Sequence, residues 1–225
     1  MFLSQLRLEG RSRAVLKDLS SAYELHRTLS RAFPGAADGG MGRVLFRVDT
    51  NRRGDEVVVL VQSEKRPDWS RLPGGYTEQT QVRDVSYSAG PAEPLANARA
   101  TTIVVRAADL LRFRLVANPT VKRDGKRHGL LREEEQLAWL ARKGQAGGFA
   151  LGGGSVVVVP LGDRQSRRPD PQRGVVGLVT HVGVRFDGLL TVVDPVRFVQ
   201  TLETGVGSAK GFGFGLLSIA PPSEP

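Results

Sequence analysis

The sequence contains no cysteine, and this absence removes several kinds of chemistry. Without cysteine among the 225 residues, disulfides, thiolate nucleophiles and cysteine-based zinc sites are excluded. Histidine is scarce as well, because the chain has only three, and none stands at metal-ligand spacing from another. We therefore expect no metal and no other cofactor. A chain without cysteine is compatible with the reducing cytosol, and we expect a cytoplasmic protein.

Long apolar runs are also missing. No stretch approaches the roughly 20 apolar residues of a membrane helix, and the residues from Met1 to Arg7 show no signal-peptide pattern. We expect no partnership with a membrane.

Acidic residues are too few to balance the basic ones. The chain has 32 Lys and Arg against 23 Asp and Glu, for a net charge of +9, and most of the excess lies in residues 98–225. Such an excess favours a polyanionic partner. Two segments are the most basic, residues 112–132 and residues 164–173. Their basic residues are Arg112, Arg114, Lys122, Arg123, Lys126, Arg127 and Arg132, then Arg164, Arg167, Arg168 and Arg173.

A glycine-rich stretch near the end of the chain surrounds one lysine. Five glycines and Lys210 lie within residues 205–215, and exposed backbone N–H groups beside a lysine suit a phosphate. The Walker pattern fails because Lys210 precedes a glycine and a strand is expected over residues 212–219. The dinucleotide fingerprint fails because the loop follows a helix. Phosphate contact and a purely structural loop both stay open on this evidence.

The first long amphipathic helix is predicted over residues 21–33. Ser21 and Glu24 match a capping box, and Pro34 ends the segment. Its apolar face would hold Ala22, Leu25, Leu29, Ala32 and Phe33. Its polar face would hold Tyr23, His26, Arg27, Ser30 and Arg31.

This polar face is the strongest candidate for catalysis. A histidine on a helix is usually not catalytic, but His26 has Tyr23 three residues before it and two arginines on the same stripe. Such a set suits RNA cleavage without a metal, in which one group takes the 2′-hydroxyl proton and another protonates the departing 5′ oxygen. His181 is predicted to be structural, and His128 to touch phosphate or be solvated. Whether His26 is acid or base stays open.

The element order predicts the fold class α+β, with two tandem ferredoxin-like (βαββαβ) domains. In residues 1–90 we expect strands at 2–8, 44–48, 56–61 and 81–86, with helices at 21–33 and 67–72. A linker is expected at 88–97. In residues 98–225 we expect a strand at 110–116, a helix at 133–143, a strand at 156–160, a hairpin turning at Asp187-Gly188, a helix from Asp194 to about Glu203 and a last strand. Residues 164–173 are expected to form a loop.

The chain resembles the CasE family, the repeat-processing endoribonucleases of type I-E CRISPR systems. The resemblance rests on an ordered series of short blocks that together span nearly the whole chain. These are residues 2–6, 22–29 (AYELHRTL), 45–48, 60–63, 67–69, 113–120, 125–127, 138–140, 205–207 and 211–217. Each block is weak alone, and their joint order is specific.

The resemblance implies metal-independent cleavage of precursor CRISPR RNA at the 3′ base of the repeat hairpin, giving 2′,3′-cyclic phosphate and 5′-hydroxyl ends. It implies that His26 and Tyr23 match the family's catalytic pair. It further implies that the product stays bound and that the other Cascade subunits are partners. The long alanine-rich segment at residues 89–108 departs from the family pattern.

RNA contact is expected from residues of the polar helix face, both basic segments and the glycine loop. We expect these to be Arg27, Arg31, Arg114, Lys122, Lys126, Arg127, Arg164, Arg167, Arg168, Arg173, Gly207 and Lys210. Arg164 to Arg173 lie where the family has a basic hairpin. From the residues alone, Arg27 and Arg31 could instead be ordinary solvated positions.

Two rival interpretations remain at this point. The chain could be an RNA-binding subunit that has the fold but no activity, in which case it would bind RNA without forming a cyclic phosphate. It could also be a mononucleotide-binding domain that uses the glycine loop, which tight binding of a free nucleotide would support.

Overall fold

The structure is a computed structural model. It describes residues 1–33, 41–51, 53, 56–90, 100–152, 156–169 and 176–222, with only the backbone at 163–169 and 176–179. The chain divides into two compact units, each described separately below. The first contains Met1–Asp84, Arg164–His181 and Lys210–Gly213, and the second contains Val85–Asp163, Val182–Ala209 and Phe214–Pro225.

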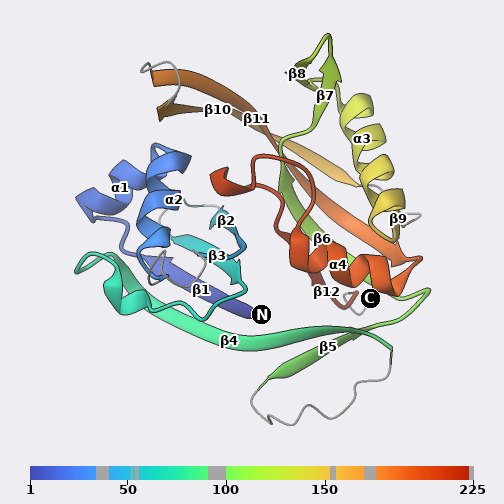
Figure 1. Ribbon diagram of the computed structural model, residues 1–225, viewed down its shortest axis with the longest axis horizontal. Helices are drawn as coiled ribbons and strands as arrows, with labels where there is room; N and C mark the ends of the chain where they lie inside the picture. The colour runs from blue at the N-terminus through green and yellow to red at the C-terminus, as the bar shows by residue number, and fades with distance from the viewer. Residues whose placement is uncertain are drawn as a thin grey trace. The chain divides into compact units, whose positions relative to one another are not determined.

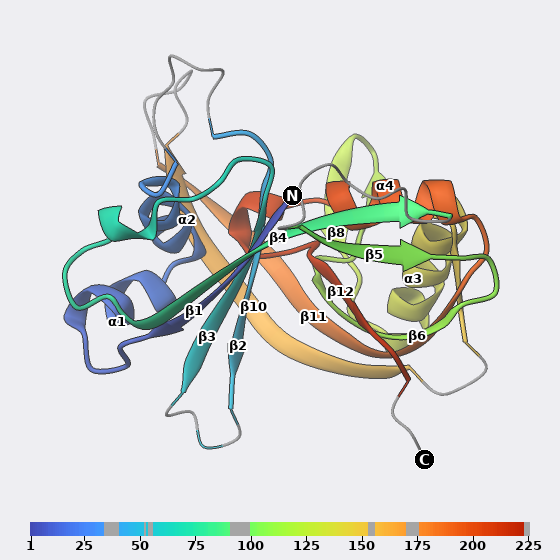
Figure 2. The ribbon, with the colours of Figure 1, turned by 90° about the horizontal axis from the view of Figure 1, so that it is seen from below.

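The first unit is built on the antiparallel strands β1 (Phe2–Leu8), β2 (Val44–Thr50), β3 (Val57–Ser63) and β4 (Thr77–Ala89), in the order β2-β3-β1-β4 (Figure 1). The helices are α1 (Arg13–Leu19) and α2 (Ala22–Ser30), and a short 3-10 turn, η2 (Trp69–Arg71), precedes β4. Figure 2 shows α1 and α2 beside β1 and β3. In β1, Leu6 and Leu8 are buried while Gln5 and Arg7 are exposed, so the alternation of the sequence directs one face to the core.

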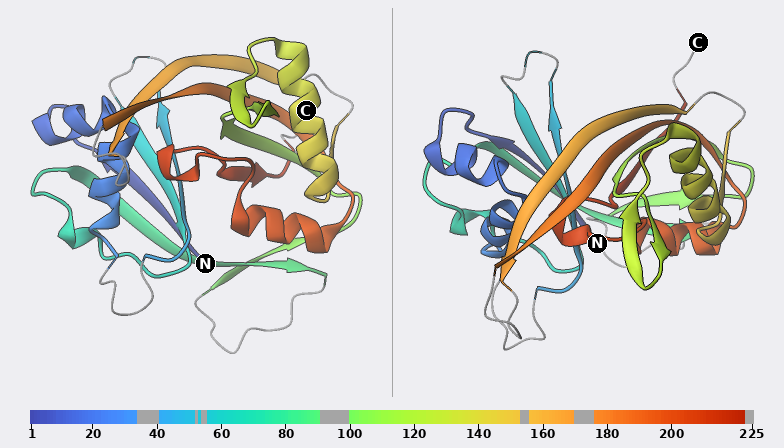
Figure 3. Two further views of the ribbon diagram at one scale, coloured as in Figure 1. Left: turned by 45° about the horizontal axis from the view of Figure 1, so that its top comes forward. Right: turned by 90° about the horizontal axis from the view of Figure 1, so that it is seen from above.

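The second unit repeats this plan. Its elements are β6 (Leu110–Ala117), α3 (Glu133–Ala146), β10 (Val157–Pro169), β11 (Val176–Val192), α4 (Pro195–Thr204) and β12 (Leu217–Ala220). The strand order is β10-β11-β6-β12, with β9 (Phe149–Leu151) also paired to β11. Aromatic residues from both helices, Trp139 and Phe198, are buried in one core with Phe113 and Phe186. Figure 3 shows β10 and β11 running side by side.

Both units therefore have the ferredoxin-like order, and the predicted α+β class with two tandem ferredoxin-like domains is confirmed. The expected domain boundaries stay a prediction, since residues 91–99 lie outside the described residues. The linker expected at 88–97 is wrong at its start, because β4 continues to Ala89. Residues 85–89 of β4 pair in parallel with β5 (Thr101–Val105).

The helix α1 was not predicted, and the capping box at its neighbour α2 is wrong. Helix α1 is only two turns long and has no acidic residue in its first turn, so it lacks the usual start signal. Ser21 precedes α2 but makes no side-chain cap. Glu24 bonds instead to the guanidinium of Arg27, so it does not reach back to close a capping box.

The hairpin predicted at Asp187-Gly188 is also wrong. Strand β11 passes straight through these residues, and its ladder with β6 continues from Val184 opposite Ala117 to Thr191 opposite Leu110. The carboxylate of Asp187 accepts from Arg114 of the facing strand, so the sheet satisfies a group that in a turn would bond to its own backbone. The Asp-Gly dipeptide is typical of turns, but here it belongs to a strand, and the partner of its carboxylate lies on the neighbouring strand.

Two further segments differ from expectation. Residues 164–169 continue strand β10 instead of forming a loop, whereas Arg173 lies outside the described residues. The strand expected from residue 212 begins only at Leu217, because residues Lys210–Phe212 form a single 3-10 turn, η3. The helix predicted from Asp194 is confirmed, and the Asp194 side chain accepts from the backbone N–H of Arg197.

A buried hydrogen bond ties α1 to the segment before β4. The Tyr76 hydroxyl donates to Asp18 at 2.8 Å, and the two residues are 1% and 5% exposed. Tyr76→Phe would keep the ring and leave a buried carboxylate without this donor. We expect the free energy of unfolding to fall by about 1–3 kcal/mol, measured by urea denaturation. Asp18→Asn, which keeps an acceptor, should cost less. An unchanged urea midpoint for Tyr76→Phe would contradict this account.

Candidate active site

The burial of one face of α2 directs the opposite face outward. Leu25, Thr28 and Leu29 are buried with 2%, 5% and 1% of their surface exposed. With 3.6 residues per turn, this leaves Tyr23, His26 and Arg27 on the other side, where Arg27 is exposed and the other two are half-buried. The predicted separation of faces is confirmed, and Tyr23 lies one turn before His26.

The imidazole of His26 lies between a core phenylalanine and the glycine loop. Its ring is nearly parallel to that of Phe46 in β2, with centroids 6.2 Å apart and an interplanar angle of 18°. At Gly211 of η3, a Cβ atom would lie 3.8 Å from His26 Cε1 and 3.9 Å from Nε2. The backbone of the loop therefore borders the Cε1–Nε2 edge of the imidazole without a side chain to cover it.

Glycine is also required two residues further along the loop, at position 213. Gly213 has φ of +82°, and a Cβ there would lie 3.0 Å from Phe46 Cε2. Both the backbone conformation and the lack of space disfavour any larger residue. The phenylalanine that supports His26 thus supports the loop as well.

Burial also sets the protonation state of the imidazole. Desolvation lowers the pKa of His26 from its ordinary value of 6.5, because a partly buried site disfavours the cation. His26 is therefore mainly neutral at pH 7, with one ring nitrogen able to accept a proton and the other able to donate a hydrogen bond. This state suits a general base and, after protonation, a general acid.

The arginines of α2 differ in their surroundings. The Arg27 guanidinium donates to Glu24, and the same carboxylate lies 3.9 Å from Lys17 Nζ. A phosphate that binds Arg27 must therefore compete with Glu24, although an exposed pair of this kind contributes little stability. Arg31 is exposed at the C-cap of the helix. Lys210 belongs to η3 and precedes the glycine that borders His26.

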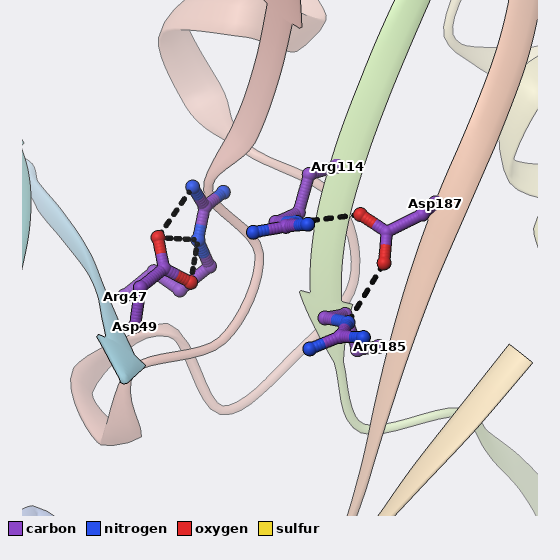
Figure 4. A network of polar contacts seen from close by, with 5 residues as sticks. All are labelled: Arg47, Asp49, Arg114, Arg185 and Asp187. Atoms are coloured by element: carbon purple, nitrogen blue, oxygen red, sulfur yellow. Dashed lines mark hydrogen bonds and ion pairs between the residues drawn. The ribbon is translucent and has the colours of Figure 1, made fainter. Parts of the chain in front are cut away.

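In the second unit, Arg114 belongs to a charged cluster on the sheet (Figure 4). Asp187 on β11 receives Arg114 and Arg185, the latter at 2.7 Å. Two guanidiniums share one carboxylate, so the cluster keeps an excess positive charge. In the first unit Arg47 is 4% exposed and paired with Asp49 at 2.9 Å. That arginine was not predicted to be functional, and its burial gives it a structural role.

Four exposed cations lie on a short hairpin of β7 (Thr120–Arg123) and β8 (Lys126–Gly129), which stands beside α3 (Figure 1). Lys122 faces Arg127 across the ladder and Arg123 faces Lys126, and all four side chains are exposed. Like charges directly opposite each other destabilise a ladder. A sequence that keeps four of them together is suited to binding an anion.

The remaining predicted RNA contacts are Gly207 and the arginines of residues 164–173. Gly207 has φ of +83°, and a Cβ there would lie 3.1 Å from Trp139 Cζ2, so core packing alone explains its glycine. The backbone of Arg164, Arg167 and Arg168 lies in β10, and their side chains are not described. Arg173 lies outside the described residues.

Four residues at this site were not predicted from the sequence, namely Phe46, His181, Gly211 and Phe212. Phe46 lies in an apolar strand and was indistinguishable from other core residues. His181 was taken as structural from its place in a strand, and the signal for Phe212 was only its position within the glycine loop. His181 and Phe212 contact each other, with ring centroids 4.6 Å apart. Burial lowers the pKa of His181 as well.

Two negative findings apply to the described part of the chain. There, no group of three or more His, Asp or Glu side chains could hold a metal ion. Likewise, none of the helices described is both long enough and apolar enough to cross a membrane.

Comparison with known proteins places the chain in a family. A family model described as "CRISPR associated protein" matches residues 1–221, and the chain therefore belongs to the CRISPR-associated protein family. It is 38% identical over 227 residues to the CRISPR-associated endoribonuclease Cse3 of Thermus thermophilus, covering 98% of this chain and 100% of that one. It is 30% identical over 237 residues to the CRISPR system Cascade subunit CasE of Escherichia coli, with the same coverage.

A solved structure supports the fold. The structure of Thermus thermophilus Cse3 bound to an RNA that represents a pre-cleavage complex matches with a TM-score of 0.74 and 38% identity, covering 98% of each chain. The resemblance to the CasE family expected from the sequence is thereby confirmed.

The protonation state of His26 can be measured directly. We expect the titration of its Cε1 proton, followed by NMR and assigned with His26→Ala, to give a pKa below 6.5. The folded chain binds this proton less readily than the unfolded chain, so His26 makes folding less favourable as the pH falls below about 6.5. A measured pKa at or above 6.5 would show that the ring is not desolvated as described.

Proposed function

We propose that this protein is a metal-independent endoribonuclease of the CasE type. It cleaves precursor CRISPR RNA at the 3′ base of the repeat hairpin and stays bound to the mature RNA in the Cascade complex. The observation that carries the proposal is a neutral His26 whose Cε1–Nε2 edge borders a glycine. Supporting it are the names of the two relatives, an endoribonuclease and a Cascade subunit, and the relative solved with a pre-cleavage RNA. The site of action is the cytoplasm.

The reaction needs two proton transfers and no metal. The 2′-hydroxyl loses its proton and its oxygen bonds to the adjacent phosphorus, while the bond from phosphorus to the 5′ oxygen breaks and that oxygen gains a proton. The products are a 2′,3′-cyclic phosphate and a 5′-hydroxyl. His26 takes one of these transfers, and Tyr23, one turn away, takes or assists the other.

Binding of the RNA repeat hairpin rests on phosphate contacts. The exposed hairpin of β7 and β8 supplies Lys122, Lys126 and Arg127, and an A-form stem is recognised largely by shape and phosphates. Near the reacting phosphate, Arg27, Arg31 and Lys210 supply positive charge. The other proposed RNA contacts are Arg114, Arg164, Arg167, Arg168, Arg173 and Gly207. The proposed domains are 1–90, with the catalytic helix, and 98–225, with the basic and glycine-rich segments.

The alternative function is an RNA-binding subunit of the same complex without activity. One observation favours it, since the guanidinium of Arg27 is already paired with Glu24 and is less available to the reacting phosphate.

The cleavage experiment separates these two functions. With the host's repeat hairpin RNA, we expect one cut at the hairpin base, and no cut when the scissile 2′-hydroxyl is replaced by hydrogen. His26→Ala should lower the cleavage rate by at least about 100-fold, because positioned acid–base groups contribute 10²–10⁴-fold, and should bind the RNA as tightly as the wild type. If the wild type binds the hairpin without cutting it, the alternative is correct.

Salt dependence tests whether the hairpin of β7 and β8 contacts RNA phosphates. We expect the affinity for the RNA to fall steeply with salt, and Lys122→Ala, Lys126→Ala and Arg127→Ala combined to flatten the slope of log K against log salt by about 2 to 3. The matched control is Arg11→Ala, Arg13→Ala and Arg142→Ala combined, which removes the same charge from exposed positions outside the proposed site. Equal slopes for both triple variants would mean that the hairpin does not touch phosphates.

A further inference from the structure

Three consecutive residues of the glycine loop each lie against one aromatic ring of the first unit. Gly211 borders the imidazole of His26, and Gly213 lies against Phe46. Between them, Phe212 contacts the imidazole of His181, with centroids 4.6 Å apart and planes tilted by 41°. Gly211, which borders the proposed catalytic histidine, is therefore followed by two residues that also lie against rings.

The loop needs such support because its backbone is permissive. Gly205, Gly207, Gly213 and Gly215 all have positive φ, and glycine loses more conformational freedom on ordering than any other residue. Within residues 207–213, Phe212 is the one large apolar side chain. Its contact with the ring of His181 is hence a side-chain interaction that can hold the turn η3 in place.

His181 provides a firm surface for this contact. It belongs to strand β11, so its backbone is held in a sheet, and only 8% of its surface is exposed. A ring separation of 4.6 Å lies at the close end of the range for favourable aromatic pairs, about 4.5–7 Å. His181, which the sequence predicts to be structural, is thus in direct contact with the loop that borders His26.

We infer that His181, acting through Phe212, is a positioning residue for cleavage. The pair fixes Gly211 at the Cε1–Nε2 edge of His26, so that a residue without a side chain leaves this edge open to the RNA. Phe46 contributes to the same arrangement, because its ring is nearly parallel to that of His26 and lies against Gly213. This inference rests on the proposed function, and it assigns His181 a role through its ring contact and not through its own proton.

The test compares two substitutions at His181 in single-turnover cleavage of the repeat hairpin. His181→Ala removes the ring, and we expect the rate to fall by roughly 100-fold, since misplacement of a catalytic group by about 1 Å has that effect. Affinity for the 2′-deoxy hairpin should stay unchanged. His181→Phe, which keeps a ring but no titratable group, should restore the rate close to that of the wild type.

A double-mutant cycle checks the route. Phe212→Ala should slow cleavage as His181→Ala does, and the double variant should be no slower than either single variant, because both remove the same contact.

A second test adds a group at the histidine edge. Gly211→Ala places a methyl group at ordinary contact distance from His26 Cε1 and Nε2, so it should fold normally and slow cleavage by obstructing the RNA. Gly74→Ala is the control, because a Cβ there meets no atom within 4 Å, and it should cleave like the wild type.

The outcomes distinguish the two claims. If the wild type cleaves and His181→Ala cleaves equally fast, or if His181→Phe is as slow as His181→Ala, the positioning role is wrong and the proposed function stands. Equal losses of affinity and rate in His181→Ala would also overturn it, since the role would then be in binding. A wild type that binds without cleaving overturns the proposed function, and the positioning role falls with it.

Discussion

The burial of Leu25 and Leu29 against the first sheet is the constraint on which the candidate site depends. Each contributes about 1.5–3 kcal/mol by leaving water, and both are almost fully buried. With 3.6 residues per turn, Tyr23 and His26 then lie on the face of the helix opposite this core. Phe46 extends this core to the ring of His26 and to Gly213 of the loop. One apolar core thus fixes the helix, the imidazole and the loop that borders it.

Much of this arrangement could be predicted from the sequence. The two faces of α2 follow from apolar spacing, and β1, β6 and α4 begin within a residue of their expected positions because alternation and the Asp194 cap are local signals. The βαββαβ order of both units follows from these elements. The candidate catalytic pair follows as well, since a tyrosine and a histidine three residues apart on a polar stripe need no knowledge of the fold.

The rest depended on partners distant in the sequence. Asp187-Gly188 has the composition of a turn, but the Asp187 carboxylate is paired with Arg114 on another strand, and no local pattern reveals that. Residues 212–219 were expected to form the last strand, yet Phe212 belongs to the turn η3 and the strand begins at Leu217. In this turn Gly211 and Phe212 lie against rings from α2 and β11. The proposed role of His181 depends likewise on its contact with Phe212, a residue 31 positions further along the chain, which no local pattern reveals.

The most direct test of the central claim is the chemistry of the cut ends. The repeat hairpin RNA, cleaved by wild-type protein in excess EDTA, would be analysed by mass spectrometry of both fragments. The account predicts a 2′,3′-cyclic phosphate on the upstream fragment and a 5′-hydroxyl on the downstream one, because the 2′-oxygen is the nucleophile. A 3′-hydroxyl with a 5′-phosphate, or cleavage that requires added divalent metal, would contradict it.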